Sequence, residues 1–179
     1  IPVLEIADYN TKGLSGPPDK PGTPFHALVK AAGVSKKDAD TSGGSFGIGK
    51  NASFAVSDLQ MVFYSTCHKS DDSPDELYAA QGKIKLVSHI DSANVARRAT
   101  GYWGNPDRFQ AITDTASIPG WMQRQSRGTS IFCVGFRHTE KWAERMAASL
   151  IANFFVAVQR GEMEFEVGNG EFLINQNTI

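Results

Sequence analysis

A glycine-rich run at residues 44–50 constrains this chain more than any other feature of its sequence. It reads Gly44-Ser45-Phe46-Gly47-Ile48-Gly49-Lys50. Such closely spaced glycines indicate a backbone that passes close to something a side chain would obstruct. The residues that follow predict a helix beginning at the last glycine, through Ala52, Phe54, Ala55 and Ser57. The unpaired amides and positive dipole end of a helix start suit a phosphate, although a plain glycine-rich connector remains the other interpretation.

The same run also lies one residue away from a P-loop. It reads Gly44-x-x-x-x-Gly49-Lys50-Asn51, with Asn51 where a P-loop has the Ser or Thr that binds magnesium. A P-loop follows a buried strand, whereas residues 34–43 are polar and charged. The context therefore favours another kind of phosphate loop. A P-loop-type NTPase or kinase using residues 44–51 stays open as an alternative.

The residues before the run predict a strand, a long loop and a short helix. Residues 3–6 are mostly apolar and lead into Asp8, which places Asp8 at the C-terminal end of a strand. Residues 9–24 are rich in glycine, proline and small polar residues, as loops are. Thr23 followed by Pro24 is a typical helix start. The helix would have Phe25, Leu28 and Val29 on one face and Gly33 as its stop.

The residues after the run alternate between strand and helix patterns. Residues 59–67 and 77–90 predict an antiparallel pair across an acidic turn at 70–76, and residues 129–136 predict a buried strand. Residues 91–125 show no sustained period and predict loops with a short helix. A long amphipathic helix should run from Thr139 to Gly161, with a stripe of Trp142, Met146, Leu150, Phe154 and Val158. Asn169-Gly170 predicts a closing hairpin.

The order of these features resembles that of the GHKL, or Bergerat-fold, ATPases. The motifs are Asp8 at a strand end, Gly13-Leu14, a helix, a polar stretch, the glycine run, and Arg127-Gly128-Thr129-Ser130-Ile131 on a strand. The glycine run followed by Ala55-Val56-Ser57-Asp58 is especially similar to the chaperone branch, and also to the MORC and MutL branches. The similarity covers residues 3–136. Several motifs in the right order are more specific than one glycine loop.

The resemblance implies an ATP-binding role for a defined set of residues. Asp8 would accept a hydrogen bond from the adenine amine, and Gly13-Leu14 would let the backbone pass close to the base. The glycines and neighbours at 44–49 would fold over the phosphates as part of a lid, and Lys50 would add charge near the γ-phosphate. Thr129 would hydrogen-bond near Asp8. Taken alone, Asp8 also reads as a loop-capping residue and Thr129 as an ordinary strand residue.

The chain departs from the family pattern in two places. The family has Asp-x-Gly-x-Gly, whereas Asn10 stands at the first glycine position here and one extra residue precedes Gly13. Asparagine tolerates a left-handed backbone better than most residues, so Asn10 is a candidate replacement. The family's Glu-x-x-x-Asn helix, which activates water and holds magnesium, has no counterpart before Ile1. The nearest look-alike, ending at Asn153, lacks the glutamate and is interpreted as structural; no catalytic residue is assigned.

Composition limits the other function classes. The formal net charge is -1 with basic residues spread along the chain, so nucleic acid is open only as a local contact and no anionic membrane surface is expected. Cys67 and Cys133 stand alone in apolar runs, which indicates buried residues in a reducing cytoplasm. The four histidines, spaced without a partner pattern, predict no metal site. The tryptophans and arginines around 91–125 suit packed aromatics, or a contact surface for nucleic acid or a partner protein.

These features together predict an α+β fold, a two-layer α/β sandwich of Bergerat type with a mixed, mostly antiparallel sheet and helices on one face. Residues 1–137 would form the nucleotide-binding core, and residues 138–179 a long helix with a hairpin. The expected function is ATP binding, with slow Mg²⁺-dependent hydrolysis, lid closure and dimerisation in an intact protein of which this chain is a fragment. A nucleotide-sensing or interaction module without turnover is the further alternative.

Overall fold

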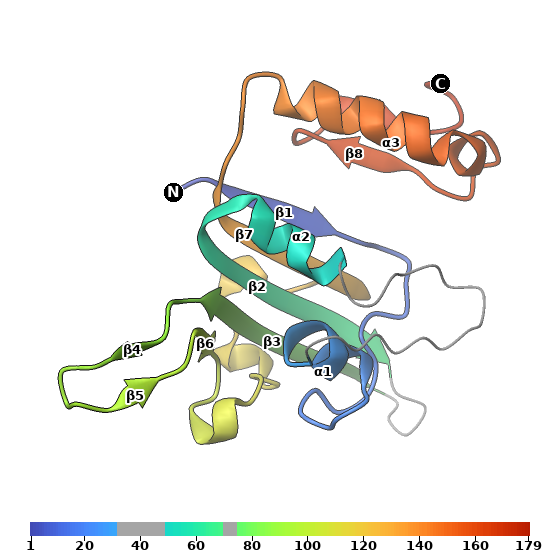
Figure 1. Ribbon diagram of the computed structural model, residues 1–179. Helices are drawn as coiled ribbons and strands as arrows, with labels where there is room; N and C mark the ends of the chain where they lie inside the picture. The colour runs from blue at the N-terminus through green and yellow to red at the C-terminus, as the bar shows by residue number, and fades with distance from the viewer. Residues whose placement is uncertain (32–48, 70–74) are drawn as a thin grey trace. The chain divides into compact units, whose positions relative to one another are not determined.

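The chain folds into two compact units. A computed structural model describes residues 1–31, 49–69 and 75–179 (Figure 1). The first unit spans Ile1–Arg137 and the second spans His138–Ile179. A five-stranded sheet dominates the first unit, and one helix with a hairpin makes up the second. The class is therefore α+β.

The sheet of the first unit is antiparallel. Its order is β1-β7-β2-β3-β6, and all four pairings between these described strands are antiparallel. The prediction of a mixed sheet is therefore wrong. β2 and β3 follow one another along the chain and pair antiparallel, and the edge strands β1 and β6 each run antiparallel to their neighbours. The strands are β1 (Val3–Ala7), β2 (Ser57–Lys69), β3 (Glu76–Lys85), β6 (Thr100–Trp103) and β7 (Gly128–Phe136).

Two short helices cover one face of this sheet. Helix α1 (Pro24–Val29) follows Thr23 at its N-cap, with proline in the first turn. Helix α2 (Gly49–Ala55) ends before Ser57, which begins β2 instead of continuing the helix as predicted. The Ser57 hydroxyl donates to the Val134 carbonyl, an interaction available to it in the sheet. The core between helices and sheet contains Phe25, Val29, Phe54, Val62, Tyr64, Ala79 and Ala111.

The opposite face carries irregular chain. Its buried cluster consists of Ala80, Ile118, Met122 and Phe132. The segment predicted as loops with a short helix holds β5 (Ala96–Arg97), β6 and three 3₁₀ turns, η1 (Asp107–Phe109), η2 (Thr115–Ser117) and η3 (Gly120–Met122). Likewise, the predicted strand at 77–90 is two strands, β3 and β4 (His89–Ile90). Elements of two to four residues are too short to show a period in the sequence.

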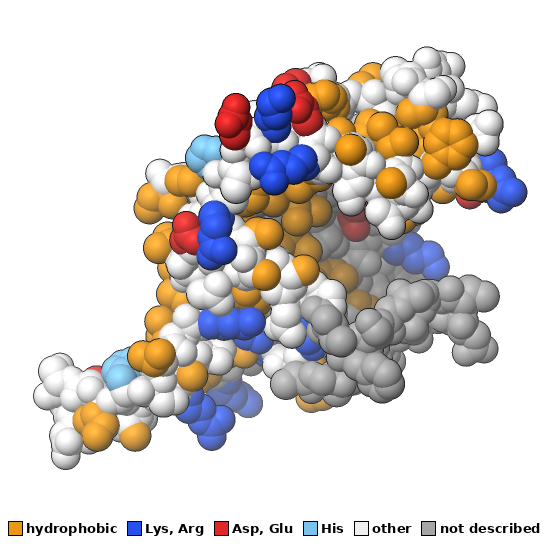
Figure 2. Space-filling view, turned by 45° about the horizontal axis from the view of Figure 1, so that its top comes forward, with side chains coloured by type: hydrophobic (Ala, Val, Ile, Leu, Met, Phe, Trp, Pro, Cys, Tyr) orange, Lys and Arg blue, Asp and Glu red, His pale blue; other side chains and the backbone are white. Residues whose placement is uncertain are grey.

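The second unit packs α3 (Trp142–Gln159) on an antiparallel hairpin of β8 (Phe165–Val167) and β9 (Phe172–Ile174). Asn169 and Gly170 adopt positive φ in the turn, as the hairpin prediction requires. The predicted stripe is only partly correct: Val158 is buried and Leu150 packs beside it, whereas Ala143 and Ala147 replace Trp142 and Met146 as buried residues. Small residues let the helix approach the hairpin closely. Phe154, Phe155 and Val156 remain exposed by 39–55%. Figure 2 shows hydrophobic side chains at the surface in several places.

Both cysteines are buried thiols, as predicted. Cys67 and Cys133 are fully buried and form no disulfide. Burial raises the pKa of Cys133 to about 11, because the thiolate would lose its hydration. They therefore pack as small hydrophobic residues. None of the described helices is long and apolar enough to cross a membrane.

Candidate functional site

Asp8 follows β1 and is held there through one carboxylate oxygen. Its backbone N–H donates to the Thr129 carbonyl over 3.0 Å, which extends the pairing of β1 with β7 by one residue. Its Oδ1 atom accepts from the Thr129 N–H and, over 3.1 Å, from the Thr11 hydroxyl. Among the described residues no donor reaches Oδ2, and the side chain is exposed. One oxygen is thus fixed, while the other has no donor among the described residues.

The loop after Asp8 lies directly against β2. Gly13 has a φ of +66°, and a Cβ built there would come within 2.3 Å of the Cys67 carbonyl oxygen. The Leu14 N–H donates to Thr66 Oγ1 over 2.9 Å, and the Thr66 hydroxyl donates to the Gly128 carbonyl over 3.0 Å. Only glycine fits at position 13, because both the left-handed backbone and the close approach exclude a side chain.

Thr66 is a site residue that the sequence analysis missed. It is fully buried on β2 and is paired with Thr129, with 3.5 Å between the two hydroxyl oxygens. The signal was present in the alternation of β2, since Thr66 shares a face with Val62 and Tyr64 and is polar where they are apolar. The structure therefore brings together Asp8, Gly13, Leu14, Thr66 and Thr129 from distant parts of the sequence.

Asn10 adopts the left-handed conformation that glycine would supply. Its φ is +58°. The turn continues through Thr11, whose hydroxyl oxygen accepts from the Gly13 N–H over 3.3 Å. Asparagine is among the residues that enter this region at modest cost. The departure from the glycine pattern is thus compatible with a tight turn after Asp8.

Only the end of the glycine run can be placed. Gly44, Ser45, Phe46, Gly47 and Ile48 lie outside the described residues. Gly49 and Lys50 begin α2, and a Cβ at Gly49 would meet no described atom within 4 Å. The contacts within the described chain thus give no steric reason for glycine at this position.

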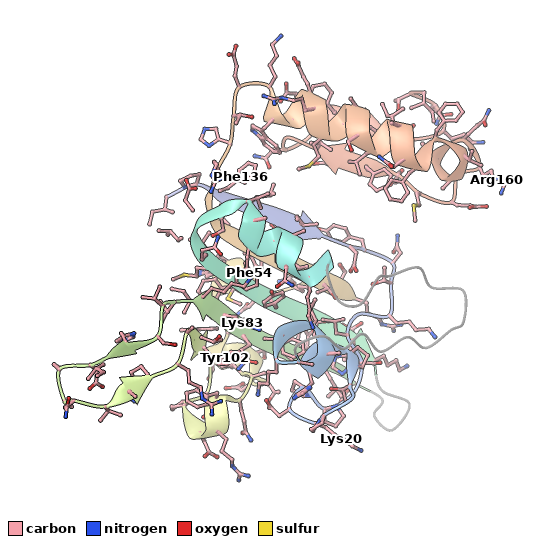
Figure 3. The ribbon with its side chains drawn as sticks, viewed as in Figure 1. Lys20, Phe54, Lys83, Tyr102, Phe136 and Arg160 are labelled. Atoms are coloured by element: carbon pink, nitrogen blue, oxygen red, sulfur yellow. The ribbon has the colours of Figure 1, made fainter. Side chains whose placement is uncertain are left out.

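Lys50 contacts the C-terminal end of α1. Its Nζ donates to the carbonyls of Ala27 over 3.2 Å and Ala31 over 2.6 Å, where helix carbonyls lack backbone partners. Lys83 donates to the neighbouring Val29 carbonyl over 2.7 Å. Burial, together with the positive charges of Lys50 and Lys85, lowers the pKa of Lys83. In Figure 3, Lys83 lies with Phe54 and Tyr102 on the helix-covered side of the sheet.

The remaining polar and aromatic candidates take structural positions. In the part of the chain that the structure describes, no three His, Cys, Asp or Glu side chains gather where they could hold a metal ion. Trp103 and Trp121 pack edge-on against Phe63, with ring centroids 5.5 and 5.4 Å apart. The buried imidazole of His68 has no hydrogen-bond partner among the described residues, and burial lowers its pKa.

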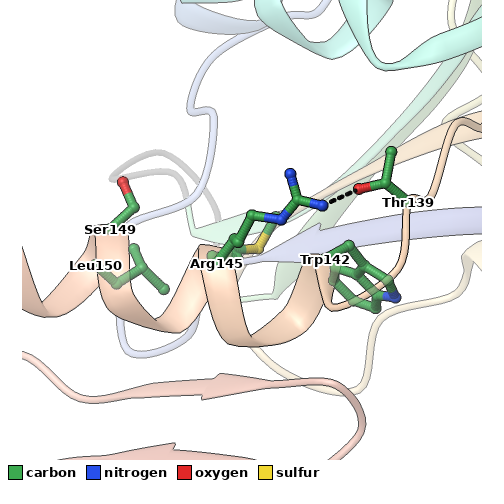
Figure 4. A pocket seen from close by; sticks show the side chains of 6 residues that line it. Thr139, Trp142, Arg145, Ser149 and Leu150 are labelled. Carbon is green, nitrogen blue, oxygen red and sulfur yellow. Dashed lines mark hydrogen bonds between the residues drawn. The ribbon is translucent and has the colours of Figure 1, made fainter.

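A shallow depression on α3 holds none of the predicted site residues (Figure 4). Arg145 lies across it and donates to the Thr139 hydroxyl over 3.0 Å and to the Glu140 carbonyl over 2.7 Å. Its donors therefore serve the start of the helix. The residues that line the depression are Thr139, Trp142, Arg145, Met146, Ser149 and Leu150.

Comparison with known proteins gives no match. No family model matches the chain, and neither the curated proteins nor the solved structures contain a significant match. The function is therefore inferred from the residues around Asp8.

Proposed function

We propose that the first unit binds adenine nucleotide and that Asp8 recognises the base. The observation that carries the proposal is the state of the Asp8 carboxylate. Thr129 and Thr11 fix Oδ1, while no donor among the described residues satisfies Oδ2. The exocyclic amine of adenine would donate to Oδ2, and a hydrogen bond to a charged group contributes about 1.5–3 kcal/mol. Guanine presents a carbonyl oxygen instead of that amine and would be disfavoured.

The surroundings of Asp8 suit a flat base. Gly13 has no side chain, so the loop after Asp8 packs directly against the Cys67 carbonyl of β2. Thr129 donates its N–H to Asp8, and its hydroxyl oxygen lies 3.5 Å from that of Thr66. Leu14 and Ile131 pack on the core beneath and offer apolar surface. A mostly apolar site with a few fixed polar groups is typical of small-molecule recognition.

The proposal includes a phosphate site and a place in the GHKL superfamily with a Bergerat-type fold. The order of motifs supports it, since Asp8 follows β1 and Thr129 lies next to it on β7. Residues 44–50 would bind the phosphates with Mg²⁺, a role that rests on the sequence alone. Slow hydrolysis and ATP-dependent dimerisation would need the glutamate and asparagine that the resemblance places in another segment. A binding module without turnover would share the same base contact and would differ only in releasing no phosphate.

Calorimetry on single variants tests the base contact. Asp8→Ala and Asp8→Asn should weaken ATP binding in the presence of Mg²⁺ by about 1.5–3 kcal/mol, because the ligand loses a hydrogen bond to a charged acceptor. Wild-type protein should bind ATP more tightly than GTP. Glu5→Gln is the matched control, since Glu5 is an exposed carboxylate of the same strand on the face opposite the helices. Unchanged ATP affinity in a folded Asp8 variant would contradict the proposal.

A further inference from the structure

Arg124 is a buried arginine that has no acidic partner among the described residues. It is only 8% exposed, and none of the ion pairs between described residues includes it. Nη2 donates to the backbone carbonyl of Asp8, Nη1 donates to the Ser130 hydroxyl, and Nε donates to the Ser126 carbonyl. These acceptors are neutral. Its hydrogen bonds tie the guanidinium to the Asp8 main chain and to β7.

The guanidinium contacts β7 on the face of the sheet opposite Thr66 and Thr129. Successive side chains of a strand point to opposite faces, so Ser130 points away from Thr129 and from the Thr66 side. Arg124 binds Ser130 and therefore lies behind the proposed base site. The ring of Tyr9 covers it, with the guanidinium carbon 5.0 Å from the ring centroid. Arg124 thus holds the backbone of Asp8 and the neighbouring strand.

Gly128 permits this approach. A Cβ at Gly128 would lie 2.2 Å from the Asp8 carbonyl oxygen, 2.5 Å from Asp8 Oδ1 and 2.6 Å from Arg124 Nη2. All three atoms surround the space that a side chain would fill. Because glycine leaves that space open, Arg124 Nη2 and Asp8 Oδ1 both lie beside the Gly128 backbone.

We infer that Arg124 is the positioning residue of Asp8, an inference that rests on the proposed adenine site. It donates a hydrogen bond to the Asp8 carbonyl and so holds this carbonyl against β7, while Thr129 and Thr11 donate to Oδ1. Asp8 is therefore fixed at its main chain and at one carboxylate oxygen, and the direction of Oδ2 is set. Pre-ordering of an acceptor removes the entropy cost of ordering it when the base binds.

A double-mutant cycle tests whether Arg124 acts through Asp8. Arg124→Met should weaken ATP binding about tenfold or more in the wild-type background, since a positioned charged acceptor is lost. In the Asp8→Ala background the same change should alter affinity by less than about twofold. Arg124→Lys keeps the charge and one donor and should recover part of the affinity, and it serves as the probe if Arg124→Met does not fold. Equal losses in both backgrounds would show a general structural role and overturn the inference.

Two further measurements separate this inference from the proposed function. The exposed Arg137, which pairs with Asp58 over 2.6 Å, provides the control variant Arg137→Met, expected to leave affinity unchanged. Amide hydrogen exchange of Thr129 reports on Asp8 without nucleotide, because that N–H donates to Oδ1. Arg124→Lys should speed exchange at Thr129 more than in the rest of β7. Absence of ATP binding by the wild type would refute the proposed function, whereas unchanged Thr129 exchange would refute the positioning role.

Discussion

Replacing Gly13 with alanine should disrupt the turn that carries Asp8. The φ of +66° costs about 1–2 kcal/mol for a residue with a Cβ. That Cβ would also lie 2.3 Å from the Cys67 carbonyl oxygen, a backbone atom of an interior strand that has no room to rotate away. The loop must then lift, and the Leu14–Thr66 hydrogen bond, worth about 0.5–1.5 kcal/mol, is lost. We expect Gly13→Ala to lower the free energy of unfolding by about 3 kcal/mol.

Gly16→Ala separates the backbone strain from the clash. Gly16 also has a positive φ, of +84°, but its Cβ would meet only the Thr23 side chain, with the methyl group at 3.1 Å, a milder contact than the 2.3 Å approach to backbone at Gly13. Urea unfolding followed by circular dichroism should give a loss of about 1–2 kcal/mol for this control. ATP affinity should fall in Gly13→Ala and stay near wild type in Gly16→Ala. Equal losses of stability in the two variants would refute the close approach of Gly13 to β2.

Two other predictions concern Lys50 and His68. Lys50→Ala should weaken ATP more than ADP and leave adenosine binding intact, measured by calorimetry; complete loss of ADP binding would instead favour the P-loop alternative. Burial lowers the pKa of His68, so the unfolded chain binds the proton more tightly and the free energy of unfolding should fall as the pH drops below about 6.5, by up to about 1.4 kcal/mol per pH unit. His68→Phe should flatten this dependence in urea titrations, and equal slopes would show that His68 does not contribute.

The sequence predicted the longer elements of the fold because they repeat a period. The strand at 129–136, the helix near 142–159 and the hairpin around Asn169 match the structure within a few residues. The wrong predictions lie where side-chain pattern carries little information. Elements such as β5 and β6 depend on pairing with neighbouring strands, and the buried face of α3 depends on Ala143 and Ala147, which a search for large apolar residues overlooks.

Site residues that need an unusual backbone conformation could be predicted from the sequence. Site residues that act through contacts with residues far along the chain were harder to predict. Gly13 could be singled out because a glycine in such a motif marks a backbone position that a side chain would block. Thr66 stood out only as a polar residue on an apolar face of its strand, and Arg124 only as one of several arginines in an irregular segment, so neither of them could be assigned a role from the sequence. Their importance comes from contacts with residues far along the chain, Leu14 for Thr66 and Asp8 for Arg124. Such contacts become visible only when the strands are paired.

The most direct test of the adenine site removes the two partners of its central hydrogen bond in turn. ATP and purine riboside triphosphate differ by the exocyclic amine, and their affinities should be measured by calorimetry for wild-type protein and Asp8→Ala. Wild type should prefer ATP by about tenfold or more, the value of a hydrogen bond to a carboxylate, and Asp8→Ala should bind the two nucleotides within about twofold. The same preference for ATP in both proteins would contradict the assignment of Asp8 to the base.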